Sequence, residues 1–167
     1  MKCQQTFGDI EFAGKKKRTR REIFLGRMER LIPWDEWTAR IKEHYPAQQR
    51  GRPAKSVSVM LRAHLLRTWY GLSAEATEDA IYDVQSMRAF AGVNLLTEDA
   101  PDATTILKFG RLLKRLGLDR RMSAELSAIL ADNRLILRKG SFSEAALVSA
   151  PRRVGGRPKG KKRQRAN

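Results

Sequence analysis

Positive charge in this 167-residue chain is concentrated in two short segments that contain no acidic residue, and this limits which part of the chain can fold. The segments are residues 15–21 and 149–167, and together they hold 14 of the 34 Lys and Arg residues. Removing these 14 charges from the net charge of +16 leaves +2 for the rest of the chain. We therefore expect one nearly neutral folded body with two polycationic arms, an arrangement typical of nucleic-acid-binding proteins.

The composition indicates one folded body in a reducing compartment. With 41% hydrophobic residues, a chain of 167 residues can bury one core but not two large ones. A single cysteine, Cys3, excludes an internal disulfide and a cysteine-rich zinc site. No segment reaches the roughly 18 apolar residues of a membrane span, and residues 1–12 lack the apolar stretch of a secretory signal. We expect a cytoplasmic protein with no membrane partner.

Apolar residues recur at spacings of three and four through most of the chain, which predicts a mainly α fold. Ser56, Ser73 and Asp102 are suited to cap helices at their N-termini, and Gly71 is suited to end one. A basic-faced amphipathic helix is expected over residues 19–32, and a more apolar one over residues 56–70. We predict a helical bundle of about six helices at residues 19–133, after a basic arm at residues 1–18.

The pattern changes after the last expected helix. Residues 135–137 and 141–148, separated by a Lys139-Gly140 turn, have the composition of a short β-strand pair. Beyond Pro151, only Val154 and Ala166 are apolar, which is too few to offset the entropy of ordering. We therefore predict a strand pair at residues 134–150 and a disordered basic tail at residues 151–167.

Two kinds of basic motif are candidates for contact with DNA. Residues 15–21 lie at the start of the first helix and are expected to contact phosphates. Gly-Arg-Pro at residues 51–53 and again at 156–158 matches the core of AT-hook peptides, whose Arg side chains lie in narrow minor grooves. The alternative is that both copies are loops with solvated Arg side chains. The candidate DNA-binding residues are Lys15, Lys16, Lys17, Arg18, Arg20, Arg21, Arg50, Arg52, Arg157, Lys159, Lys161, Lys162, Arg163 and Arg165.

Other side chains that could take part in binding or catalysis have structural explanations. Aromatic residues at helical spacing more often belong to a core than stack on bases, and this applies to Trp34, Trp37, Trp69 and Tyr70. His44 and His64 lack the clustered partners of a metal site. Glu144 is of interest because it lies inside an apolar strand. No nucleophile, P-loop or zinc motif is present, so composition and spacing indicate no catalytic or metal site.

A series of short blocks runs through the chain in a fixed order. They are QTF (5–7), REIFL (21–25), RME (27–29), PW (33–34), YP (45–46), GRP (51–53), MLR (60–62), WYGLS (69–73), EDAIY (78–82), SMRAF (86–90) and PDATTI (101–106). In order and spacing they resemble the N-terminal region of IS-five-type insertion-sequence transposases, over about residues 2–151. The resemblance implies a bacterial, nucleoid-associated protein that recognises the terminal inverted repeats of its own element.

The resemblance also implies an RNase-H-like catalytic domain, whose Asp-Asp-Glu triad binds two Mg²⁺ ions. Glu144 stands at the position of the first catalytic Asp, and its extra methylene would displace the carboxylate from the geometry that Mg²⁺ demands. The other two acids have no counterpart, so residues 134–150 would be the start of a truncated catalytic domain. The chain is expected to have no catalytic residue and no cofactor, whereas the complete family enzyme uses Mg²⁺. Gly110 also departs from the family, which has Arg after the residue equivalent to Phe109.

The expected partner is double-stranded DNA, and a helix within residues 56–70 or 74–83 could enter its major groove. Three alternatives remain open. The chain could inhibit an intact transposase, by occupying its repeats or by pairing with it through Leu-rich surfaces of residues 103–133, and it could also pair with itself. It could be the first frame of an active enzyme completed by ribosomal slippage. It could also be an unstable remnant whose strands at residues 135–148 expose apolar faces.

Overall fold

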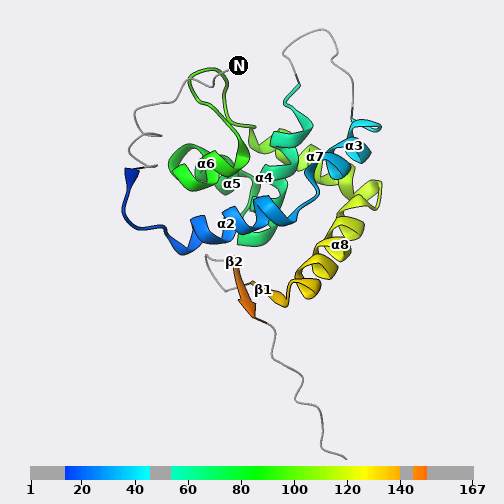
Figure 1. Cartoon of the computed structure of the whole chain (residues 1–167). Helices are drawn as coiled ribbons and strands as arrows, with labels where there is room; N and C mark the ends of the chain where they lie inside the picture. The colour runs from blue at the N-terminus through cyan, green and yellow to red at the C-terminus, as the bar shows by residue number, and fades with distance from the viewer. Residues whose placement is uncertain (1–13, 46–53, 140–144, 150–167) are drawn as a thin grey trace, which may run out of the picture.

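The computed structural model describes residues 14–45, 54–139 and 145–149, and within them the fold is mainly helical (Figure 1). The predicted fold class is therefore confirmed, although these residues contain seven helices instead of about six. Two strands pair as an antiparallel sheet. The elements are α2 (Arg20–Leu31), α3 (Trp34–Lys42), α4 (Val57–Tyr70), α5 (Ala74–Asp83), α6 (Gln85–Ala91), α7 (Ala103–Arg115), α8 (Leu118–Asp132), β1 (Leu135–Lys139) and β2 (Ala145–Ser149).

The helices begin and end where local chemistry favours it. The side chains of Ser56, Ser73 and Asp102 each accept a hydrogen bond from the backbone N–H three residues later, as predicted for N-caps. Helix α4 ends at Gly71, whose φ of 63° is left-handed, a conformation that glycine adopts at low cost. These boundaries depend on residues adjacent in sequence, which explains why spacing alone located them.

Helix α4 forms the centre of the fold (Figure 1). It is contacted by α3, α5, α6 and α7, and Phe24 of α2 packs edge-on against Trp69 with ring centroids 5.3 Å apart. A helix that is apolar nearly all round belongs in a core. Trp37, Trp69 and Tyr70 are buried, which confirms their expected role in the core, and Trp34 is half-buried. The buried residues of α4 are Val57, Val59, Met60, Leu61, Ala63, His64, Leu65, Leu66, Trp69 and Tyr70.

The strand pair packs on the helical body. Strand β1 lies against α8 and β2 lies against α2, and Leu137 pairs with Leu147 in the antiparallel register. Leu135, Leu137 and Leu147 are half-buried against the core, whereas Ile136, which points the other way, is 47% exposed. One apolar face of the hairpin is therefore covered, and the expectation that the strands expose their apolar faces is wrong for that face.

Helices α3 and α8 are joined by a polar cluster at Glu125. Its carboxylate accepts hydrogen bonds from Trp37 Nε1 at 2.8 Å, Arg40 Nη1 at 2.7 Å and Arg121 Nε at 3.1 Å. Burial alone would raise the pKa of Glu125, but the hydrogen bonds from Arg40, Trp37 and Arg121 outweigh it and hold that pKa below its ordinary value. Glu125 is therefore ionised at neutral pH and connects α3 to α8.

The Leu-rich segment at residues 103–133 does not form an apolar surface. Leu113, Leu126 and Leu130 are buried in the core, and the remaining leucines of α7 and α8 are half-buried. Among the described residues, every large apolar side chain that is exposed lies outside this segment. Pairing with an intact transposase through leucines here is therefore not supported, because those side chains already stabilise the fold.

A search of the described helices for a membrane span found none, since none combines the required length with sufficient apolar character.

Candidate nucleic-acid interface

The basic arm is held against the first turn of α2. Thr19 and Glu22 form a capping box, in which the Thr19 hydroxyl accepts from the Glu22 N–H and the Glu22 carboxylate accepts from the Thr19 N–H at 2.5 Å. Lys15 Nζ lies 2.5 Å from the same carboxylate. Burial opposes ionisation of Glu22, but the contacts with Lys15 and Thr19 outweigh it and lower its pKa. Lys15 therefore anchors the arm, while Lys16, Lys17 and Arg18 are exposed beside it.

The outward face of α2 carries a basic stripe. Arg20, Arg27 and Arg30 are exposed, and they are spaced by seven and three residues, which places them on one side of the helix. Ile23, on the same side, is 44% exposed. The inward face carries Phe24, Leu25 and Met28, which are buried. Helix α2 thus presents three guanidinium groups to solvent; two of them, Arg27 and Arg30, were absent from the candidate residues although the helical spacing could have identified them.

Arg21 is oriented differently from the stripe. It is half-buried, and its guanidinium carbon lies 5.6 Å from the centroid of the Tyr70 ring, a cation–π contact with α4. Five of the six candidate cations at residues 15–21 are exposed, although one of these, Lys15, is bound to Glu22, and the sixth, Arg21, packs on the core.

Both acids of α2 are engaged on the side away from the stripe. Glu22 is bound by Lys15, and Glu29 receives two hydrogen bonds from the Arg62 guanidinium of α4, the one from Nη2 at 2.8 Å. Since each carboxylate is neutralised by a partner, neither cancels the charge of Arg20, Arg27 or Arg30. The positive potential of the outward face is therefore left intact for an anionic partner.

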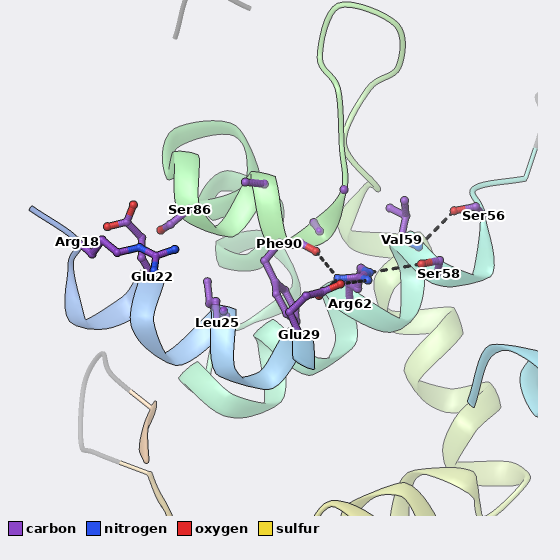
Figure 2. Close-up of a pocket in the computed structure, with 14 residues that line it drawn as sticks. Arg18, Glu22, Leu25, Glu29, Ser56, Ser58, Val59, Arg62, Ser86 and Phe90 are labelled. Atoms are coloured by element: carbon purple, nitrogen blue, oxygen red, sulfur yellow. Dashed lines mark hydrogen bonds and ion pairs between the residues drawn. The ribbon is translucent and has the colours of Figure 1, made fainter. Parts of the chain in front are cut away.

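A groove of about 650 Å³ lies between α2, α4 and α6, next to the arm (Figure 2). Arg18 and Glu22 stand at one end and Arg62 at the other, with Ser58 and Phe90 beside it. The Arg62 guanidinium donates to the Phe90 carbonyl at 3.0 Å and lies 3.9 Å from the Trp34 ring centroid. Because Arg62 of α4 bonds both Glu29 of α2 and the Phe90 carbonyl of α6, it holds the three helices together and positions the stripe.

Neither helix expected to enter the major groove is suited to it. Helix α4 is buried on nearly all sides and has no free face to insert. Helix α5 exposes Glu75, Asp79 and Asp83, whose charge repels a phosphate backbone. The burial of α4 and the acidic surface of α5 do not favour the prediction that these helices read bases. Periodicity showed which residues are apolar but not how many sides of a helix the tertiary fold covers.

The remaining candidates lie outside the described residues. These are Arg50 and Arg52 of the first Gly-Arg-Pro motif, Glu144 between the strands, and the tail residues Arg157, Lys159, Lys161, Lys162, Arg163 and Arg165.

Among the described residues, no group of three or more His, Cys, Asp or Glu side chains is placed to hold a metal ion. His64 is buried in α4 and its Nε2 lies 3.1 Å from Asp119 Oδ1 of α8. Burial is the main influence and lowers the pKa of His64, and Asp119 opposes this shift. His64 is therefore a neutral core residue, as expected for a histidine without clustered partners.

Comparison with known proteins identifies the domain. A family model described as a transposase domain, DUF772, matches residues 13–112, which include α2 to α6 and most of α7. No solved structure matches the chain. The matched region contains the basic stripe of α2, its neutralised acids and the central helix α4, and it covers more than half of the 167 residues. The chain therefore belongs to the DUF772 transposase domain family.

Proposed function

We propose that this chain binds double-stranded DNA at the terminal inverted repeats of an IS-five-type insertion sequence, as the DNA-binding part of its transposase. The observation that carries the proposal is the outward face of α2. Within a transposase-family domain, it presents Arg20, Arg27 and Arg30 in line with an exposed basic arm, while both acids of the helix are neutralised on the other side.

In this proposal the stripe and the arm contact the phosphates of the DNA backbone. Arg20 to Arg30 span about 15 Å along the helix axis, close to four base-pair steps of about 3.4 Å. Lys16, Lys17 and Arg18 extend the contact beyond the N-terminus of α2, and Lys15 keeps the arm in place through Glu22. Each phosphate neutralised releases counterions and steepens the dependence of log affinity on log salt by about 0.9. Phosphate contacts fix the position of the protein on DNA, so preference for a repeat needs base contacts as well.

We further propose that these 167 residues do not supply strand transfer. Glu144 stands at the position where the resemblance places the first catalytic Asp, and its extra methylene would displace the carboxylate from the place where an Asp carboxylate would bind Mg²⁺. In the complete family enzyme, Mg²⁺ would stabilise the attacking and leaving oxygens of the phosphoryl transfer. The contribution of this chain is recognition, with the basic tail adding affinity that does not depend on sequence.

The proposal is tested by fluorescence anisotropy with two duplexes, one carrying the terminal repeat of the encoding element and one scrambled, at several salt concentrations. In the first variant, Arg27→Gln and Arg30→Gln remove two charges from the stripe. The matched control, Lys42→Gln with Arg134→Asn, removes two exposed charges outside it. We expect the first variant to lower the salt slope by about 1.8 and the control to change it little. Equal slopes for the two variants, or no preference for the repeat, would refute the proposal.

A further inference from the structure

A second group of cations lies on α7, far from the arm in sequence. Lys108, Arg111, Lys114 and Arg115 are all exposed, and α7 contains no acidic residue. None of the four forms an ion pair with an acid in the described part of the chain. Lys108, Arg111 and Arg115 recur at spacings of three and four, on the side opposite the buried Ile106, Phe109 and Leu113.

Cations of neighbouring helices extend the group on α7. Lys114 of α7 and Arg120 of α8 line a polar hollow of about 430 Å³ where the two helices meet. The acid in this hollow, Asp119, is bound by His64 at 3.1 Å. Arg67 of α4 lies against α7, because a Cβ atom added at Gly110 would lie 3.6 Å from Arg67 Nη1. Repulsion by Arg67 and Lys114 contributes to the lowered pKa of the buried His64.

The like charges on α7 repel one another and destabilise the helix. Like charges at i and i+4 on a helix destabilise it, and Arg111 and Arg115 form such a pair. Lys114 and Arg115 favour the C-terminal dipole of α7, but Lys108 and Arg111 lie in its middle and Arg120 lies in the first turn of α8, where the dipole disfavours cations. A polyanion bound across these residues would remove the repulsion.

The cations of α7 do not face the same way as the stripe of α2. Helix α7 packs on α4 at His64, where the Phe109 and His64 rings are 6.2 Å apart, and α2 packs on α4 at Trp69 and Tyr70 through Phe24. Trp69 and Tyr70 lie about 140° and 240° around α4 from His64. Helices α2 and α7 therefore pack on nearly opposite sides of α4, and their outward faces point apart. A straight duplex lying along α2 does not reach α7.

We propose that Lys108, Arg111, Lys114, Arg115 and Arg120 form a second DNA-backbone-binding surface, which contacts a different segment of duplex from the one held by α2. This rests on the proposed function in that the partner is the same polymer. Lys108 to Arg115 span about 10 Å, close to three base-pair steps. The exposed guanidinium groups suit phosphate, because they present several donors in a fixed planar fork. The surface holds the backbone and reads no sequence.

The first test compares salt slopes of the full chain with those of Arg111→Gln/Arg115→Gln, on repeat and scrambled duplexes alike. Gln is a good helix former and the substitutions relieve the repulsion between Arg111 and Arg115, so circular dichroism should show a melting temperature no lower than that of the parent. We expect the slope to fall by about 1.8 on both duplexes, so that the loss of affinity between 50 and 200 mM salt is about tenfold smaller than for the parent. The control Lys42→Gln/Arg134→Asn should keep the parent slope.

The second test measures acetylation of individual lysines by mass spectrometry with and without duplex. Protection of Lys108 and Lys114, with Lys42 labelled equally in both states, supports the proposal. The proposal would be overturned if each of the three lysines is labelled equally with and without duplex, or if the salt slope of the α7 variant equals that of the control. The outcome is separable from the proposed function: if Arg27→Gln/Arg30→Gln weakens binding and the α7 variant does not, only the second surface fails. If the effects of the two variants add when combined, the surfaces act independently.

Discussion

Gly110 provides the sharpest test of the packing in this structure. It lies in the middle of α7, is buried, and has an ordinary helical backbone. A Cβ atom at this position would lie 3.5 Å from His64 Nδ1, 3.6 Å from Arg67 Nη1 and 3.6 Å from His64 Cε1. These are ordinary van der Waals distances, so alanine fits without displacing a neighbour. The Gly110→Ala protein should therefore be more stable than the parent.

The magnitude follows from two contributions. Replacing glycine by alanine inside a helix stabilises it by about 1 kcal/mol, and burying one methyl group adds about 0.8 kcal/mol. The matched control is Gly26→Ala in α2, which is exposed and has no atom within 4 Å of the new Cβ, so only the helix contribution remains. Gly71→Ala should lose about 1 kcal/mol, because the φ of 63° disfavours a side chain. The expected order of stability is Gly110→Ala, Gly26→Ala, parent, Gly71→Ala.

Thermal unfolding followed by circular dichroism measures this order. For a chain of this size, 1 kcal/mol moves the melting temperature by about 2–4 °C. Gly110→Ala should therefore melt several degrees above the parent and above Gly26→Ala. A Gly110→Ala protein that melts below Gly26→Ala would show that the space between α4 and α7 is smaller than the structure indicates, and would refute the packing argument.

Two further predictions concern ionisable groups in the fold. Glu125→Gln removes the negative charge that Arg40 and Arg121 share, and should lower the free energy of unfolding in urea by about 1 kcal/mol after allowance for partial exposure. The control is Glu36→Gln, because Glu36 contacts Arg40 from a far more exposed position. Equal effects of the two variants would contradict the role assigned to Glu125. His64 has a lowered pKa, so the unfolded chain binds a proton first as pH falls below about 6.5, and the free energy of unfolding should decrease from there as pH falls. His64→Gln should flatten this pH dependence. A slope retained in His64→Gln would assign the effect to another group.

Sequence reasoning located the features that depend on neighbours in the chain. The caps at Ser56, Ser73 and Asp102 and the end of α4 at Gly71 could be predicted because each needs only the residues of one helical turn. The inward positions of Trp37 and Trp69 followed from helical spacing. The family resemblance agrees with the transposase-domain match, while the IS-five type itself stays a prediction.

Features that depend on tertiary packing could not be predicted in this way. The apolar stripe of residues 56–70 indicated one buried face, but the fold buries α4 on nearly all sides, which does not favour it as a recognition helix. Acid-free runs marked the arm, yet the cations of α7 are separated by apolar residues and become a surface only once the helix forms. The pairing of Arg62 with Glu29, 33 residues apart, likewise has no local signal.

The burial of α4 has a consequence for how proteins with this domain can diverge. Nearly every substitution in α4 disturbs the core, whereas the outward residues of α2 and α7 contact few other side chains and can change at little cost in stability. Because α4 fixes the angle between these two helices, changes on either outer face leave the placement of the other unaffected. Either outer face can therefore change without a compensating substitution elsewhere in the domain.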